Sequence, residues 1–381
     1  MVTPFTIDIP EQSLERIRSR IEAYDWSLLP DVGGWEAGTG VADLKRLVDY
    51  WKDAFDWRSV ERALNRTPQF TTQIEGERIH FLHLRGDGSK PPLLLLHGWP
   101  GSFIEFDGVM NALAADGHDV VVASLPGFAF SNPITGVIGP RRAAELFHGL
   151  MVKLYGSTRY VVQGGDWGAH IASWMAYLEP ASLLGFHINM VAIFATDAKP
   201  ITEDEKAFFK RRDVILDEET GYNHEQETRP QTLGMALADS PVGAAAWILE
   251  KFGTWADLPR REDGSPDLWS RFTEDQLLTN IMLYVAPPAI VTSTWIYHGK
   301  RLEGSERFPE GARICVPMGV AAFPDPVFIP TPRSFVEKTY SNVVHWTDMP
   351  RGGHFAAMEE PDLMLADLRT FMTEITGGDL D

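Results

Sequence analysis

The feature that most constrains this chain is a strand-like run that leads through a glycine-flanked acid directly into a helical segment. The run at 160–162 is apolar, and Gly164-Gly165-Asp166-Trp167-Gly168 follows it. So tight a turn strains its central residue, and the positions two before and two after that residue must lack bulk. The pattern predicts a nucleophile elbow with Asp166 at its tip, although an ordinary turn can also contain Gly-Gly-Asp. A carboxylate at this position favours attack on an sp3 carbon over acyl transfer.

Short apolar runs separated by helix-length segments extend along most of the chain. The expected strands are 70–74, 78–84, 92–97, 119–124, 159–163, 184–189, 313–320 and 342–350. After an opening β-hairpin, this alternation predicts a mostly parallel sheet covered by helices on both faces. The gap between the strands at 189 and 313 contains helical patterns at 203–212, 231–239, 241–252 and 274–285. The sequence therefore predicts an α/β fold with a helical cap inserted after the sixth strand.

The expected organisation has four parts, within the range of one large domain that carries an insertion. Their boundaries are an N-terminal arm at 1–60, a first core segment at 61–195, the cap at 196–304 and a second core segment at 305–381. The arm has helical patterns near 14–24 and 41–55, and its several tryptophans need a surface to pack on. We therefore expect it to pack on the core and the cap.

The charge of the chain excludes two classes of partner. Its 34 Lys and Arg residues against 53 Asp and Glu residues give a net charge of −19, with an acidic end at 378–381. Such a charge repels nucleic acids and anionic membrane surfaces. The first ten residues lack the basic and apolar parts of a leader, and no apolar run approaches the ~20 residues that span a bilayer. We therefore expect a cytoplasmic protein, with neither nucleic acid nor membrane as a partner.

Cys315 is the only cysteine, which excludes an intrachain disulfide. It falls within the predicted strand 313–320, where a packed thiol is the usual occupant. We therefore expect a buried thiol with no catalytic role. We also expect neither a cofactor nor a metal ion.

Two loops at the ends of predicted strands supply partners for Asp166. His354 lies in a glycine-rich loop between the last predicted strand and a helical pattern at 358–371, a position that suits a general base. In the α/β-hydrolase triad the chain order is nucleophile, acid and histidine, so the acid should follow the strand 313–320. Asp325 stands there between two prolines and is the candidate that orients His354. A turn-forming role for this aspartate remains an alternative.

A third loop, His97-Gly98-Trp99-Pro100-Gly101-Ser102, directly follows the buried-type strand at 92–97. In a sheet of this kind that strand lies beside the nucleophile strand, and the loop amides can turn towards the carboxylate. The backbone amides of Trp99 and Trp167 are thus candidate oxyanion-hole donors. The loop could also be only a turn.

Together these motifs resemble the microsomal-type epoxide hydrolases, including their soluble bacterial relatives, over nearly the whole chain. The matching segments are His97–Ser102, Gly164–Gly168, Arg351–Ala357 and Glu359-Glu360-Pro361, with Ser240–Gly243, Ile248–Phe252 and Leu277–Asn280 in the cap. The resemblance implies an α/β-hydrolase fold, with Asp166 as nucleophile and His354 as the residue that activates water. It also implies that Tyr222 and Tyr297, both in the cap, bind the epoxide oxygen. One departure is that the family usually has glutamate where Asp325 and Pro326 stand.

The resemblance implies an epoxide hydrolase that makes a vicinal diol through a covalent aspartyl ester. Its partner would be a small-molecule epoxide, and the aromatic content, including Trp247 and Trp255, suggests a bulky apolar or aryl one. Detoxification and natural-product biosynthesis both remain open as roles, and a homo-oligomer remains open as the assembly.

Two other functions remain as alternatives. Haloalkane dehalogenases resemble the chain at the Asp-Trp-Gly elbow, and Trp167 could donate to a halide. Tyr222 and Tyr297 favour an epoxide, because a halide leaves without needing a proton. The second alternative is a ligand-binding α/β-hydrolase relative without turnover, against which intact Asp166 and His354 argue.

Overall fold

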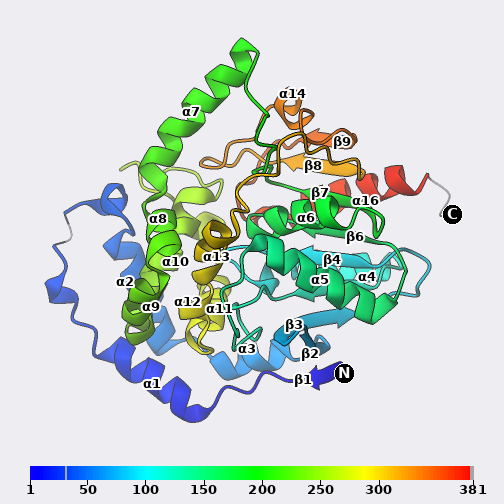
Figure 1. The fold of residues 1–381 in the computed structure, drawn as a ribbon. Helices are drawn as coiled ribbons and strands as arrows, with labels where there is room; N and C mark the ends of the chain where they lie inside the picture. Colours follow the sequence, from blue (N-terminus) through cyan, green and yellow to red (C-terminus); the bar gives the residue numbers. More distant parts are fainter. Residues whose placement is uncertain (31, 378–381) are drawn as a thin grey trace.

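The computed structural model describes residues 1–30 and 32–377, so the acidic end at 378–381 lies outside the described residues. Its centre is a nine-stranded sheet with the order β1-β2-β3-β5-β4-β6-β7-β8-β9 (Figure 1). The strands are β1 (Thr3–Phe5), β2 (Gln69–Ile74), β3 (Glu77–Leu84), β4 (Leu93–Leu96), β5 (Val120–Ala123), β6 (Tyr160–Gly164), β7 (Leu183–Ile188), β8 (Met318–Ala322) and β9 (Val343–Asp348). From β5 to β9 along this order the strands are parallel, whereas β1, β2 and β3 pair antiparallel.

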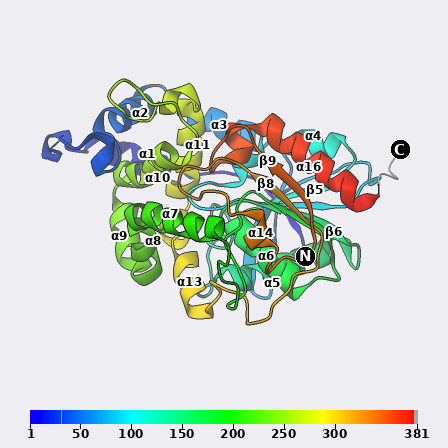
Figure 2. The same ribbon diagram turned by 90° about the horizontal axis from the view of Figure 1, so that it is seen from above.

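Helices cover both faces of the parallel part of the sheet. Helices α5 (Pro140–Tyr155) and α6 (Trp167–Leu178) lie on one face, and α4 (Met110–Ala115) and α16 (Pro361–Thr376) lie on the other (Figures 1 and 2). Strands buried on both faces need apolar side chains at every position, which is why Leu93–Leu96 reads as an unbroken apolar run. The predicted doubly covered α/β sheet is therefore confirmed, and β4 pairs with β6 as expected.

An all-helical stretch separates β7 from β8 and stands to one side of the sheet (Figure 1). Its helices are α7 (Glu203–Glu219), α8 (Gly221–Thr228), α9 (Pro230–Asp239), α10 (Pro241–Trp255), α11 (Glu274–Val285), α12 (Ala289–Thr292) and α13 (Trp295–Glu303). The insertion follows the seventh strand and not the sixth, because the short strand β1 escaped prediction. Helix α7 is also longer than expected, and α8, α12 and α13 had no predicted counterpart.

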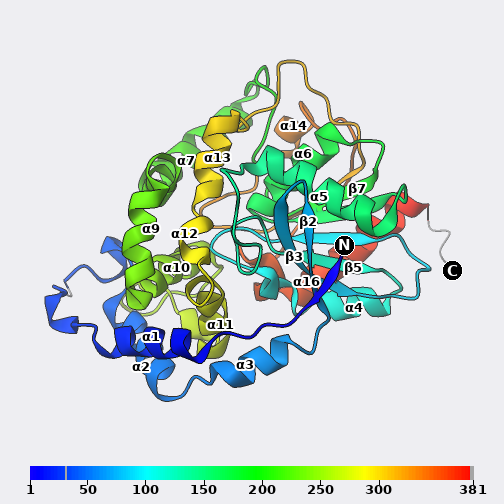
Figure 3. The same ribbon diagram turned by 60° about the horizontal axis from the view of Figure 1, so that its bottom comes forward.

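The N-terminal segment contacts both the sheet and the inserted helices. Strand β1 pairs with β2, while α1 (Glu11–Glu22) packs against α10, and α2 (Val41–Asp53) packs against α10 and α11 (Figure 3). Helix α3 (Trp57–Leu64) then leads back to the sheet, and Asp56 caps its first turn.

Within the described residues, no single helix is long and apolar enough to cross a membrane. Two bent helix pairs, α9–α10 and α11–α13, have the length and composition of a membrane span only when each pair is taken together.

The structure corrects two details near the carboxyl end of the chain. Strand β8 begins at Met318, so Cys315 lies before it and is exposed, contrary to the expected packed thiol. Pro317 has no amide proton and cannot extend the ladder of hydrogen bonds backwards. The predicted helix at 358–371 is divided into α15 (Ala356–Glu359) and α16, because Pro361 starts a new first turn. The remaining helix is α14 (Arg333–Val336).

Candidate active site

Asp166 stands at the junction of β6 and α6 with φ 46° and ψ −122°. This conformation is rare for a residue with a side chain and costs on the order of 1–3 kcal/mol. A Cβ atom on Gly164 would overlap the backbone of Gly168, and one on Gly168 would overlap the carbonyl of Leu96. The structure therefore has both features that the sequence predicts: a strained backbone at Asp166, and glycines two positions before and after it that no larger residue could replace without overlap.

His354 lies between two carboxylates. Its Nδ1 is 2.8 Å from Oδ2 of Asp325, and its Nε2 is 3.5 Å from Oδ2 of Asp166. The second oxygen of Asp325 accepts hydrogen bonds of 2.8 Å from the amides of Val327 and Phe328, which fix the orientation of the carboxylate. The structure thus brings together the three residues that chain order alone had grouped.

The two carboxylates decide the protonation of His354. Burial lowers the pKa of the imidazole, but hydrogen bonds and charge from Asp166 and Asp325 raise it more, to about 10. With Asp166 ionised, His354 is therefore a cation at neutral pH. Two other carboxylates lie between Asp325 and His354 in the sequence, but neither contacts His354. Glu337 pairs with Arg333, and Asp348 accepts a hydrogen bond from the indole of Trp346.

The loop after β4 meets Asp166 as expected. The amide of Trp99 donates a 2.8 Å hydrogen bond to Oδ1 of Asp166. Two residues of the inserted helices hold this loop in place. Asn280 donates a hydrogen bond to the carbonyl of Pro100, and Tyr284 donates one to the carbonyl of Gly101. Among the described residues, the amide of the second predicted donor, Trp167, forms no hydrogen bond with the Asp166 carboxylate.

Tyr222 and Tyr297 come from α8 and α13, which pack side by side. Both side chains are almost wholly buried, and their rings lie 5.9 Å apart at an angle of 84°. Tyr222 stacks on Trp99, and Tyr297 makes a T-shaped contact with Trp167. Burial, with the Asp166 carboxylate adding to it, raises the pKa of both tyrosines well above the usual value, so that both are proton donors at neutral pH.

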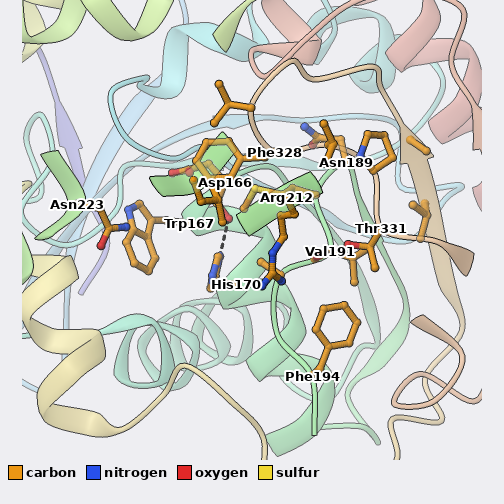
Figure 4. A pocket seen from close by; sticks show the side chains of 18 of the residues that line it. Asp166, Trp167, His170, Asn189, Val191, Phe194, Arg212, Asn223, Phe328 and Thr331 are labelled. Atoms are coloured by element: carbon orange, nitrogen blue, oxygen red, sulfur yellow. Dashed lines mark hydrogen bonds between the residues drawn. The ribbon is translucent and has the colours of Figure 1, made fainter. Parts of the chain in front are cut away.

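An open pocket of about 200 Å³ brings Asp166 and the two tyrosines onto one surface. Figure 4 shows Asp166 among the side chains that line it, with His170 hydrogen-bonded to its backbone carbonyl. Most of the lining is apolar and includes Met190, Val191, Phe194, Leu216, Val327, Phe328 and Trp346. Within the described part of the chain, no group of three or more His, Cys, Asp or Glu side chains is arranged to hold a metal ion.

Glu359 organises the loop of His354, a role that was not predicted. Its carboxylate accepts hydrogen bonds of 2.8 to 2.9 Å from the amides of Gly353, Phe355 and Asp257. The amide of His354 itself donates to the carbonyl of Trp255. The only signal in the sequence is the Glu359-Glu360-Pro361 motif, which gives no hint of these contacts.

Comparison with known proteins identifies the family of the chain. Residues 2–106 match the family model described as epoxide hydrolase N terminus, and residues 91–217 match that of the alpha/beta hydrolase fold. Epoxide hydrolase 1 of Sus scrofa is 35% identical, over 97% of this chain and 88% of the relative. A protein of Stigmatella aurantiaca is 39% identical, over 97% of this chain and 84% of the relative. The chain belongs to the epoxide hydrolase family.

Solved structures of the family show how far the likeness extends. The juvenile hormone epoxide hydrolase of the silkworm Bombyx mori superimposes with a TM-score of 0.87 at 31% identity, covering 99% of this chain and 95% of that one. The Aspergillus niger epoxide hydrolase gives a TM-score of 0.82 at 29% identity, with 98% and 97% covered. The resemblance inferred from the sequence is therefore confirmed, and these comparisons do not indicate a haloalkane dehalogenase.

Proposed function

We propose that this epoxide hydrolase converts its substrate to a vicinal diol through a covalent ester on Asp166. The observation that carries the proposal is the line of carboxylate, imidazole and carboxylate formed by Asp166, His354 and Asp325. Asp166 also lines the pocket, together with Tyr222 and Tyr297. A nucleophile, a base with its orienting acid, and a pair of proton donors are the parts that the reaction requires.

In the first step, Oδ2 of Asp166 attacks a carbon of the epoxide ring, while Oδ1 stays bonded to the amide of Trp99. The carbon–oxygen bond of the ring breaks, and its electron pair goes to the epoxide oxygen. Tyr222 and Tyr297 hydrogen-bond to that oxygen, and one of them supplies its proton. The high pKa of both tyrosines supports this role, because it keeps the hydroxyl groups protonated before the ring opens.

In the second step, a water molecule loses a proton to His354 and attacks the ester carbonyl of Asp166. Formation of the ester removes the negative charge that Asp166 places beside His354, so the pKa of the imidazole falls from its resting value of about 10. His354 then gives up its proton, which replaces the proton that the tyrosine lost. The neutral imidazole can now act as the base that accepts a proton from water. The amides of Trp99 and Trp167 stabilise the tetrahedral oxyanion, which collapses to diol and free Asp166.

The apolar lining of the pocket supports a bulky apolar or aryl epoxide as substrate. A panel of aryl and alkyl epoxides and haloalkanes, with detection of both diol and halide, tests the proposal. Diol from at least one epoxide and no halide is the expected result. Halide release without diol would restore the dehalogenase, and binding without product would favour the relative without turnover.

We also keep a cytoplasmic location as a proposal, supported by the net charge of −19. Detoxification and natural-product biosynthesis remain the two roles for such an enzyme. Fractionation of the source cells, followed by assay of diol formation in each fraction, tests the location directly.

A further inference from the structure

A second, smaller cavity adjoins the active site and has room for about one water molecule. It shares Asp166 and Asn189 with the substrate pocket, and its other lining residues are different. The polar side chains among them are Glu105, Gln163 and His354. Because Asp166 lines both cavities, a water molecule in the smaller one would lie beside Asp166 while a substrate occupies the larger one.

The cavity contains polar atoms whose hydrogen-bonding capacity is not used within the described residues. Oε1 of Gln163 is buried and forms no hydrogen bond, and Nε2 of His354 makes only its 3.5 Å ion pair with Asp166. The amide nitrogen of Gln163 donates to Asn189, which fixes the direction of its oxygen. Buried waters in proteins make about three hydrogen bonds to such groups. His354, Gln163 and Glu105 together provide three partners.

Glu105 reaches the cavity from a 3₁₀ turn at Phe103–Phe106, directly after the Trp99 loop. Its carboxyl group lies so close to Gly101 that a Cβ atom there would overlap Oε1. Burial raises the pKa of Glu105 to about 8, with Asp166 adding to the rise and His354 opposing it. At neutral pH the group is mostly a neutral acid, which accepts a hydrogen bond without placing a second anion beside Asp166.

We propose that this cavity binds the water that hydrolyses the Asp166 ester and that Glu105 positions it. One hydrogen of the water points to Nε2 of His354, the other to Glu105 or Gln163, and the oxygen lone pair faces Cγ of Asp166. His354 takes the first proton as the new carbon–oxygen bond to Cγ forms. The second proton of the water passes to the substrate oxygen as the bond between Cγ and that oxygen breaks, which releases the diol and restores the Asp166 carboxylate. The inference rests on the proposed ester mechanism.

The test compares the two chemical steps in the wild type and in Glu105→Met, which keeps the size but removes the polar group. Ester formation and ester decay are followed by rapid quenching and mass spectrometry of the intact protein in a single turnover. We expect ester decay to slow by roughly tenfold, the effect of one hydrogen bond, with ester formation unchanged. Glu105→Gln, which retains an acceptor, should restore most of the decay rate. Asp107→Asn is the matched control on the same segment and should behave as the wild type.

Three results would overturn the inference: ester decay in Glu105→Met within twofold of the wild type, equal slowing of both steps, or no recovery in Glu105→Gln. If Glu105→Met does not fold, Glu105→Asp replaces it, because a shorter side chain withdraws the carboxyl group from the cavity and should slow decay in the same way. Absence of any ester in the wild type would instead count against the proposed function itself, so the two failures are distinguishable.

Discussion

Replacement of Asp325 by asparagine isolates the contribution of one carboxylate to the hydrolytic step. Asparagine is similar in size and can still accept the hydrogen bonds from Val327 and Phe328. Its amide group, however, removes the charge that lies 2.8 Å from Nδ1 of His354. If the amide donates to Nδ1, the imidazole proton must sit on Nε2, the nitrogen that has to accept a proton from water.

The size of the expected effect follows from the loss of one buried hydrogen bond to a charged group. A buried hydrogen bond to a charged group contributes about 1.5–3 kcal/mol, and loss of the carboxylate of a triad slows turnover by about 10⁴-fold in a well-studied case. We therefore expect ester hydrolysis in Asp325→Asn to slow by roughly 10²- to 10⁴-fold. Ester formation should change much less, because Asp166 attacks without proton transfer to His354.

Single-turnover experiments with excess enzyme measure both steps. The protein mass should rise by the mass of the substrate and remain raised in Asp325→Asn, whereas the wild type returns to its starting mass. Glu337→Gln is a suitable control, because Glu337 pairs with Arg333 and does not contact His354. Unchanged hydrolysis in Asp325→Asn, or equal slowing of both steps, would refute the assignment of Asp325.

Three further predictions follow from the site and its surroundings. Changing both Tyr222 and Tyr297 to Phe should abolish ring opening and leave the melting temperature near that of the wild type; wild-type diol formation would contradict this. Gly168→Ala, whose Cβ overlaps the carbonyl of Leu96, should lower the free energy of unfolding by roughly 1–3 kcal/mol in urea titrations, and a loss below about 0.5 kcal/mol would contradict it. Because the folded pKa of His354 is raised from 6.5 to about 10, its contribution to stability is complete below pH 6.5 and is lost as the pH rises to 10. Denaturation at several pH values should show this loss, and His354→Gln should reduce it.

The parts of the site that lie on strand ends could be predicted from the sequence. Asp166, His354 and Asp325 each follow an apolar run, and glycines or prolines mark the loop in which each stands. Parallel strands bring their carboxyl ends to one edge, so chain order was enough to group the three residues. The close packing around Gly164 and Gly168 was also readable, because it is local to one turn.

Other parts depend on contacts between segments that are distant in the sequence. Tyr222 and Tyr297 stand on α8 and α13, two short helices without a predicted counterpart, and only the family resemblance pointed to them. The hydrogen bonds of Glu359 and the position of Glu105 arise only when loops from different strands meet. Strand β1, at Thr3–Phe5, is too short to show a period of two and is held by its pairing with β2.

The central claim is that Asp166 attacks carbon directly, and a single turnover in heavy-oxygen water tests it. With enzyme in excess, direct attack delivers an oxygen of Asp166 to the substrate, so the first diol is unlabelled. The water oxygen enters the carboxylate instead, and the peptide that contains Asp166 carries the label. Labelled diol in that first turnover, with an unlabelled Asp166 peptide, would contradict the covalent mechanism and show that Asp166 only activates water.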